Sequence, residues 1–187
     1  DVDESVAAEM DKVFLEVVIA PSFTPGAVEI LSSKKNRIIL QRKSTGSEKA
    51  SFRSMLGGIL WQERDTSTET SSMMKPATTR HPSEEEYQDL VFANKIVKHS
   101  RSNAMVLAKG RQLCASGIGQ TSRLDALRQA IDKARTFGFS LDGSVMASDA
   151  FFPFADSVTT AHEAGISAVV QPGGSVRDQE SIDYCNK

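Results

Sequence analysis

The sequence predicts an α/β protein in which helices alternate with the strands of a mainly parallel sheet. Short runs rich in β-branched residues recur along the chain, and segments with helical spacing of apolar residues lie between them. This alternation favours helices layered on a sheet, because a helical crossover returns the chain to begin the next strand in the same direction. With 187 residues, 40% of them hydrophobic, the chain can form one substantial core or two small ones.

The first 45 residues predict a helix, a strand, a second helix and a second strand, in that order. Apolar residues recur at helical spacing within residues 3–15, and the β-branched run of residues 16–20 ends at a proline. Thr24 followed by Pro25 is typical of a helix N-cap with proline at the first helical position. Residues 37–41 then form the second strand, which completes one β-α-β unit.

Residues 46–82 form a connector between two subdomains, which we place at residues 1–45 and 83–187. Ser, Thr, Glu and Gly dominate this connector. One apolar island interrupts it at residues 55–61. We expect this island to form a hairpin or strand that is held against a core.

The segment at residues 83–187 alternates helices and strands again. Three acidic residues, Glu84 to Glu86, follow Pro82 and Ser83, and they would lie in a first helical turn, where the helix dipole favours them. Apolar periodicity and β-branched runs predict the remaining elements. These are a strand at residues 104–108 followed by a return strand near residue 113, a helix at 123–137, a strand at 145–148, a helix at 158–164 and a strand at 168–171.

Charge and composition exclude several classes of function. The 22 basic and 24 acidic residues give a net charge of −2, so no long-range field would gather nucleic acid or an anionic membrane. No apolar stretch approaches the roughly 20 residues that span a bilayer. Cys114 and Cys185 stand outside any CxxC or Cys/His pattern, so we expect neither a disulfide framework nor a metal site. Small molecules remain as the expected ligands.

Two segments place an amide or glycines beside predicted strands. Residues 98–104 gather two cations, a histidine and the amide of Asn103, which can both donate to and accept from one substrate group. The alternative is a solvated helix end whose cations face the helix dipole. Residues 116–123 lead into a helix, whose free N–H groups suit an anion. The alternative there is a tight turn with Ser122 as N-cap, which the spacing alone favours.

Two further segments favour a flat ligand. Residues 148–156 place three phenylalanines around Pro153 between two carboxylates, and the proline prevents a regular element, so the rings must pack from a loop. An apolar wall beside a carboxylate suits a heteroaromatic ring, although aromatic runs more often belong to a core. Residues 171–178 form a similar loop, in which glycines expose backbone groups. The sequence contains neither a Gly-x-Ser-x-Gly motif nor the ligand pattern of a zinc deaminase.

The order and spacing of these four segments resemble the AICAR transformylase family. The matching runs are Lys98-His-x-x-Ser-Asn-Ala104, Gly117-Ile-Gly-Gln-x-Ser-Arg123, Ser148-Asp-Ala-Phe-Phe-Pro-Phe154 and Gln171-Pro-Gly-Gly-Ser-Val-Arg-Asp178. The resemblance covers nearly the whole chain and implies the C-terminal part of the formyltransferase domain of a bifunctional purine-biosynthesis enzyme, whose other domain is an IMP cyclohydrolase. It implies cytidine-deaminase-like three-layer units without zinc. Residues 1–45 would be the tail of the first unit, and residues 83–187 would be the second, truncated at its C-terminus.

The resemblance also implies an activity and a set of site residues. The family transfers a formyl group from 10-formyltetrahydrofolate to the 5-amine of AICAR, giving FAICAR, at active sites shared across a homodimer. By this resemblance Asn103 lies at the reacting centre, and Asp156 hydrogen-bonds the folate ring. The remaining folate-binding positions are Arg123, Phe151, Phe152, Pro153, Phe154, Gly173 and Gly174.

The resemblance further implies that the chain is a fragment. The family's Lys-His-x-[Ser/Asn]-Pro motif has no counterpart here, since a different sequence follows Lys98 and His99. We therefore expect the fragment to be inactive alone and its parent to be active. The parent would act in the cytosol, or in the plastid stroma if it comes from the plant or algal branch, which residues 179–187 resemble. The alternative is a non-catalytic scaffold or interaction module that retains the fold.

Overall fold

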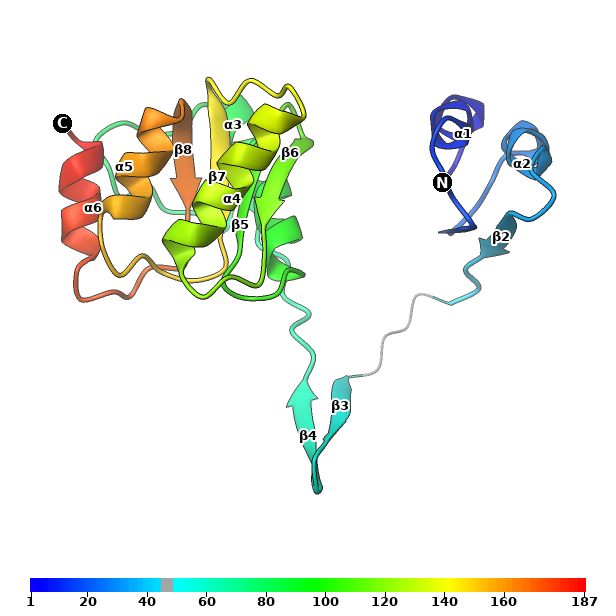
Figure 1. Ribbon diagram of the computed structural model, residues 1–187, viewed down its shortest axis with the longest axis horizontal. Helices are drawn as coiled ribbons and strands as arrows, with labels where there is room; N and C mark the ends of the chain where they lie inside the picture. Colours follow the sequence, from blue (N-terminus) through cyan, green and yellow to red (C-terminus); the bar gives the residue numbers. More distant parts are fainter. Residues whose placement is uncertain (45–48) are drawn as a thin grey trace. The chain divides into compact units, whose positions relative to one another are not determined.

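The computed structural model describes residues 1–44 and 49–187 and divides them into two units, Asp1–Thr66 and Ser67–Lys187 (Figure 1). Each unit has its own packing and is described separately. Among the described helices, none combines the length and the apolar character that crossing a membrane requires.

The first unit contains the predicted helix–strand–helix–strand segment. Its elements are α1 (Glu4–Asp11), β1 (Val17–Ala20), α2 (Pro25–Ser32) and β2 (Ile38–Gln41), and β1 pairs in parallel with β2. Thr24 caps α2 as predicted, since its hydroxyl accepts the N–H of Ala27 at 3.2 Å. Leu31 of α2 packs with Val18 of β1 in a small buried cluster. This part of the prediction is confirmed, except that α1 ends at Asp11 rather than near residue 15.

Arg37 fastens the ends of the two helices in this unit. Its side chain is 1% exposed, and its Nη1 donates to Asp11 Oδ1 at 2.8 Å and to the carbonyl of Leu31 at 3.1 Å. The hydrogen bond from Arg37 is the largest cause that holds the pKa of Asp11 below its ordinary value, and a hydrogen bond from Lys34 adds to it. A buried guanidinium therefore joins the last residue of α1 to the last turn of α2.

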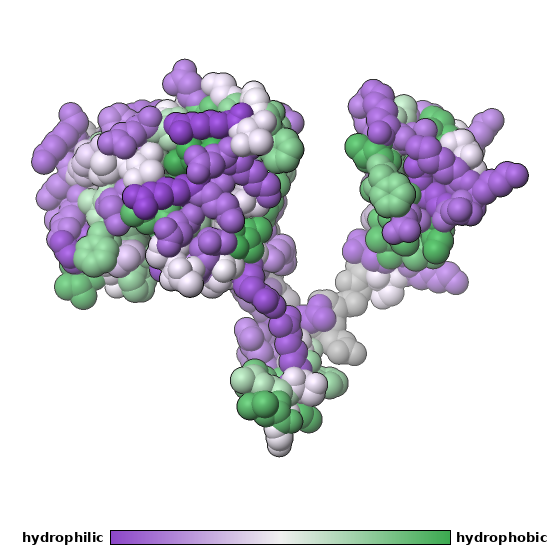
Figure 2. Space-filling model, in the orientation of Figure 1, coloured by the Kyte–Doolittle hydropathy of each residue, from purple (hydrophilic) through white to green (hydrophobic). Residues whose placement is uncertain are grey.

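The apolar island of the connector forms a two-stranded hairpin. Strands β3 (Ala50–Met55) and β4 (Gly58–Glu63) are antiparallel, and Phe52 lies opposite Trp61. Both rings are exposed, at 70% and 66%, and Figure 2 shows hydrophobic residues gathered at the end of the hairpin. The expected hairpin is present, but its apolar side chains are exposed rather than held against a core.

The second unit is built on a four-stranded sheet with the order β6–β5–β7–β8 (Figure 1). Helix α3 covers one face of this sheet, and helices α4 and α5 cover the other. Its elements are η1 (Ser71–Met73), α3 (Glu84–Lys98), β5 (Met105–Lys109), β6 (Gln112–Gly117), α4 (Arg123–Thr136), β7 (Ser144–Ser148), α5 (Asp156–Glu163), β8 (Ile166–Val170) and α6 (Asp178–Cys185).

The α/β class is confirmed, but the expectation of a mainly parallel sheet is wrong for the strand pairing. Strand β5 is antiparallel to both β6 and β7, and only β7 and β8 pair in parallel. The cause is a tight turn at Gly110 and Arg111, which both have positive φ and reverse the chain from β5 into β6. Because α4 and α5 are crossovers, β6, β7 and β8 share one direction, and β5 is the reversed strand between them.

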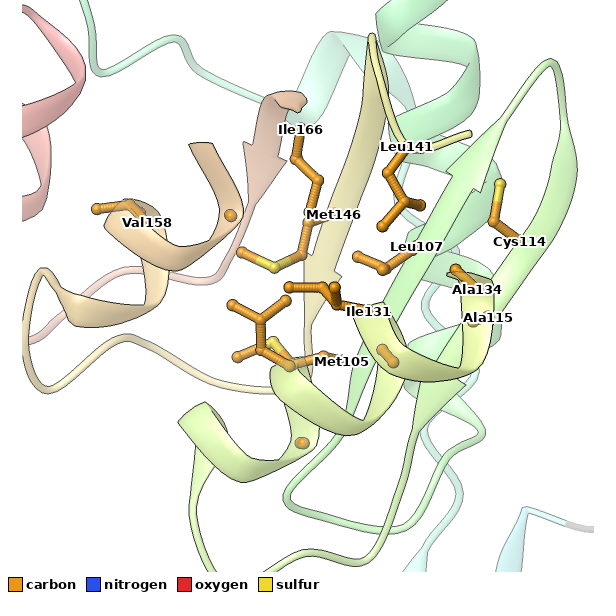
Figure 3. Close-up of a cluster of buried hydrophobic side chains, with 14 of the residues drawn as sticks. Met105, Leu107, Cys114, Ala115, Ile131, Ala134, Leu141, Met146, Val158 and Ile166 are labelled. Atoms are coloured by element: carbon orange, nitrogen blue, oxygen red, sulfur yellow. The ribbon is translucent and has the colours of Figure 1, made fainter. Parts of the chain in front are cut away.

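Side chains of the central strands alternate between two buried cores. Met105, Leu107 and Met146 pack with Ile131 of α4 on one face (Figure 3). Their neighbours Val106, Ala108, Val145 and Ala147 pack against α3 on the other face. Strands that are buried on both faces have nearly continuous apolar sequences, which is why residues 104–108 and 145–148 were recognisable as strands.

Candidate functional site

All four segments singled out in the sequence lie at one edge of the four-stranded sheet. Strands β6, β7 and β8 end at this edge, and the reversed strand β5 begins there. Residues 98–104 lead into β5, and residues 118–123, 149–156 and 171–178 follow β6, β7 and β8. We call this the site edge, because ligands of open α/β sheets bind beyond the carboxyl ends of the strands.

Asn103 is half-buried at the site edge and is bonded to the loop that follows β6. Its backbone exchanges two hydrogen bonds with Gln120, at 3.2 and 3.3 Å, and its side-chain Nδ2 donates to the carbonyl of Gln120 at 2.9 Å. A carbonyl oxygen can only accept, so the amide nitrogen must face Gln120. The amide orientation is therefore fixed, with Oδ1 on the other side of the group.

Asp149 ties down both neighbours of Asn103. It follows β7 directly, and its side chain is only 9% exposed. Oδ1 accepts the N–H of Ala104 at 3.0 Å, and Oδ2 accepts the hydroxyl of Ser102. One carboxylate thus anchors the residue before Asn103 and the residue after it.

Arg123, the first residue of α4, lies beside the same carboxylate. Its Nη2 is 3.9 Å from Asp149 Oδ1, a separation that gives Coulomb attraction without a hydrogen bond. Its Nε is buried and has no hydrogen-bond partner among the described residues. A buried donor without a partner costs about 1–3 kcal/mol, so an acceptor placed there would be stabilised.

The glycine segment after β6 serves packing rather than an exposed anion nest. A Cβ on Gly117 would lie 1.8 Å from the carbonyl oxygen of Ala126, so only glycine lets β6 approach α4 this closely. The N–H of Gly119 donates to the carbonyl of Arg101 at 2.8 Å. Ser122 accepts the N–H of Asp125 at 3.1 Å, which is the N-cap of the tight-turn alternative. The structure supports that alternative over an anion site.

The phenylalanines after β7 divide between the surface and the core. Phe152 is 1% exposed and belongs to the core beneath α4, so its ring offers no surface to a ligand. Phe151 and Phe154 are exposed at 42% and 49%, and Pro153 is half-buried between them. Asp156 is exposed and begins α5. The exposed rings and this carboxylate remain accessible.

The loop after β8 contacts the phenylalanine loop. The guanidinium carbon of Arg177 lies 4.6 Å from the centre of the Phe154 ring, a cation–π contact. Gly173 and Gly174 have positive φ, as their role in a tight loop requires. Their N–H groups are not exposed donors as expected, because Gly173 donates to Gln171 Oε1 at 3.1 Å and Gly174 to Asp178 Oδ2 at 2.8 Å.

The sequence placed Asp149 and Asp178 in the candidate segments, but their role in holding these loops was not predicted. Asp149 joins residues 45 to 47 positions away, and Asp178 closes its own glycine loop by accepting from Gly174 and Ser175. A usable signal for Asp149 is its place directly after a fully buried strand. Asp178 gives no comparable signal, because an acidic residue at a helix start is common.

Two other features bear on the site. The described residues contain no group of three or more His, Cys, Asp or Glu side chains that could hold a metal ion. A shallow groove of about 340 Å³ lies between α4 and α5 and is lined by Arg128, Ile131, Asp132, Arg135, Thr160, Glu163 and Ala164. None of the residues predicted for the site lines this groove, so the chemistry at the site edge locates the candidate site better than the groove does.

Comparison with known proteins supports the resemblance over the whole chain. The model of the AICARFT/IMPCHase bienzyme family matches residues 1–133. The bifunctional purine biosynthesis protein PurH of Bacteroides thetaiotaomicron is 56% identical over 186 residues, which cover 100% of this chain and 37% of that protein. The PurH proteins of Acetivibrio thermocellus and Aquifex aeolicus are both 47% identical, and they too are matched by the full chain.

The chain spans little more than a third of the length of these curated relatives, at 37%, 37% and 36%. All three are bacterial, so they lend no support to a plant or algal origin. With a family model that matches 133 of 187 residues and an identity of 56% along the full chain, the chain belongs to the AICARFT/IMPCHase bienzyme family.

Proposed function

We propose that the protein containing this chain transfers the formyl group of 10-formyltetrahydrofolate to the 5-amine of AICAR, giving FAICAR in purine biosynthesis. Membership of the AICARFT/IMPCHase bienzyme family supports this reaction and assigns IMP cyclohydrolase activity to another part of the same protein. The observation that carries the proposal is the amide of Asn103, fixed at the site edge beside Arg123, whose buried Nε lacks an acceptor among the described residues.

The reaction requires positioning and electrostatic stabilisation rather than a covalent enzyme intermediate. The amine attacks the formyl carbon, a new C–N bond forms, the bond from carbon to the folate nitrogen breaks, and one proton passes from the amine to the departing nitrogen. Asn103 Oδ1 can accept an N–H of the amine, and its second Nδ2 hydrogen can donate to the developing oxyanion. The bond from Nδ2 to Gln120 holds that amide in one orientation before substrate binds.

The folate would bind along the two loops that carry exposed aromatic surface. Phe151, Pro153 and Phe154 supply an apolar wall, and Asp156 supplies an accessible carboxylate for the ring nitrogens. Gly173 and Gly174 shape the adjoining loop, while Phe152 supports the wall from the core. Arg123 would complete the pocket, since its Nε has no hydrogen-bond partner among the described residues.

The larger assembly follows from the same family. We propose that residues 83–187 form the second of two cytidine-deaminase-like subdomains, that residues 1–45 are the tail of the first, and that residues 46–82 connect them. We further propose a homodimer with shared active sites that works in the cytosol. Because the chain spans 37% of a full-length relative, the 187 residues alone are expected to be inactive.

The direct test is a formyl-transfer assay on the full-length protein, with AICAR and 10-formyltetrahydrofolate as substrates and release of tetrahydrofolate as the signal. The 187-residue chain is assayed alongside. Turnover by the full-length protein and none by the chain is the expected result. An inert full-length protein would contradict the proposal and favour the non-catalytic scaffold.

A further inference from the structure

We propose that Asp149 is a positioning residue for formyl transfer, one that holds Asn103 and Arg123 in register with each other. This inference rests on the proposed function and adds to it a residue that does not itself touch substrate. Asp149 combines a nearly buried side chain with contacts to two different loops, and both of those loops carry residues of the candidate site.

The first step is the geometry around Asn103. Ser102 and Ala104 flank this residue, and each donates to a different oxygen of the Asp149 carboxylate. The amide of Asn103 is held on its other side by the carbonyl of Gln120. Gln120 therefore holds the backbone and the side chain of Asn103 itself, while Asp149 holds the two flanking residues. Release of the carboxylate would loosen the chain on both sides of Asn103 while the bonds to Gln120 remained.

The second step is electrostatic. Asp149 Oδ1 is the anionic atom within 4 Å of the Arg123 guanidinium, and it also accepts the N–H of Ala104. At 3.9 Å the carboxylate attracts Arg123 without taking a hydrogen bond from it. The same oxygen thus contacts both Arg123 and the residue after Asn103, so it couples the positions of the two segments.

The third step compares Asp149 with a carboxylate that has only a fold role. Asp89 is buried, and it accepts the N–H groups of Gly110 and Arg111 at 2.8 and 2.6 Å. Those bonds close the turn between β5 and β6, where none of the predicted site residues lies. Asp149 uses the same chemistry on the two residues that flank Asn103, so its bonds set the position of a group assigned to catalysis.

The test uses Asp149→Asn in the full-length protein, with Asp132→Asn as the matched control. Asparagine keeps the shape but removes the charge, and its NH₂ group would face one of the two donors. We expect kcat for formyl transfer to fall about 10- to 100-fold, because small displacements of a reacting group have effects of this size, while KM for AICAR changes less than about threefold. Asp132, an exposed carboxylate on α4, should leave both constants unchanged.

A double variant separates positioning from loss of stability. If Asp149 acts through Asn103, then Asn103→Ala with Asp149→Asn should have the same kcat as Asn103→Ala alone, within about twofold. A merely structural role would multiply the two losses instead. Ser102→Ala removes one contact from an exposed serine, and it should lower kcat severalfold even if Asp149→Asn does not fold.

The outcomes distinguish this inference from the function on which it rests. An active wild type together with normal kcat in Asp149→Asn, or in Ser102→Ala where Asp149→Asn does not fold, would overturn the role of Asp149 and leave the proposed function standing. Multiplying losses in the double variant would do the same. An inactive wild-type protein would overturn the proposed function and the inference together.

Discussion

The two edges of the four-stranded sheet both carry buried carboxylates, but these do different things. At the edge opposite the site, Glu86 accepts from Arg80 at 2.7 and 2.8 Å, from Ser167 at 2.6 Å and from the N–H of Ser83 at 2.8 Å. At the site edge, Asp149 holds the residues around Asn103. Glu86 joins the ends of structural elements, whereas Asp149 joins two loops that carry predicted site residues.

The contrast shows that a buried donor without a hydrogen-bond partner is a better guide to a functional site than a buried carboxylate is. Around Glu86 the contacts lead to the helix cap Ser83, the strand residue Ser167 and the loop residue Arg80, and no donor there is left buried without a partner among the described residues. Around Asp149, the Nε of Arg123 is buried and has no hydrogen-bond partner within residues 1–44 and 49–187. A buried donor without a partner destabilises the fold, and a bound ligand that accepts its hydrogen bond would offset this loss. Changes at the two edges should therefore separate stability from turnover.

The largest expected effect is on stability at the site edge, from Gly117→Ala. The added Cβ would lie 1.8 Å from the carbonyl oxygen of Ala126, so β6 and α4 must move apart. We expect a loss of about 3 kcal/mol or more in the free energy of unfolding, measured from the thermal unfolding of the full-length protein. Gly57→Ala is the control, because a Cβ there meets nothing within 4 Å. A Gly117→Ala protein as stable as the control would contradict this packing.

The next effect is on turnover, from Asn103→Ala. Removing the amide takes away both its acceptor and its donor, and we expect kcat to fall about 100-fold. Stability should change by only about 1 kcal/mol, since one hydrogen bond to Gln120 is lost. Asn94→Ala, which alters an amide on α3 bonded to Glu69, should keep its kcat. Normal turnover in Asn103→Ala would remove that residue from the reacting centre.

The sequence predicted the segment that contains Asn103 but did not predict the close packing at Gly117. The segment that contains Asn103 was found because its composition is unusual and because the apolar run of residues 104–108 after it was recognisable as a strand. The caps were equally local, and Thr24 and Ser122 cap helices at the predicted places, while Glu84 to Glu86 lie in the first turn of α3 as expected. Local signals of this kind depend on neighbouring residues alone, so the sequence displays them directly.

Other features depend on pairing between distant segments and were not predicted. The return strand near residue 113 was predicted, but the antiparallel pairing of β5 with β7 was not, because β6 and α4 separate these two strands in the chain. The role of Asp149 depends on residues 45 to 47 positions away. The glycines at residues 173–174 were expected to expose backbone groups, but the N–H of Gly174 donates to Asp178. The pairing of β5 with β7 and the contacts of Asp149 form only when the folded sheet brings residues that are distant in the sequence together, so local sequence patterns do not indicate them.

At the opposite edge, Glu86→Gln should lower stability with little effect on turnover. Burial raises the pKa of Glu86, but the bonds from Ser167, Arg80 and Ser83 outweigh it, so the net pKa lies below the ordinary value of 4.5. A lowered pKa stabilises the fold above pH 4.5, and this stability is lost as the pH falls through the folded pKa. We expect a cost of about 1–2 kcal/mol at pH 7.

The measurement for Glu86 is thermal unfolding of the full-length protein between pH 3 and pH 7. The difference between wild type and Glu86→Gln should be largest near neutral pH and should vanish toward the acid end. Glu85→Gln alters an exposed neighbour and should change stability by no more than about 0.5 kcal/mol. A difference that grows as the pH falls would have the wrong sign for a carboxylate with a lowered pKa.

The smallest expected effect concerns folate binding, from Asp156→Asn. Asp156 is exposed at the start of α5, and loss of its charge should raise KM for 10-formyltetrahydrofolate about tenfold, as expected for one charged hydrogen bond. KM for AICAR should stay within about twofold. Steady-state kinetics with each substrate varied in turn provides the measurement. Unchanged folate KM would remove Asp156 from the pocket.

The most direct test of the difference between the two edges compares Asn103→Ala and Glu86→Gln in the full-length protein. Both kcat for formyl transfer and the midpoint of thermal unfolding are measured for each, with turnover followed well below that midpoint. The account predicts that Asn103→Ala loses turnover and keeps its midpoint within a few degrees, while Glu86→Gln keeps turnover and unfolds earlier. Equal loss of turnover in both variants, or normal turnover in Asn103→Ala, would contradict it.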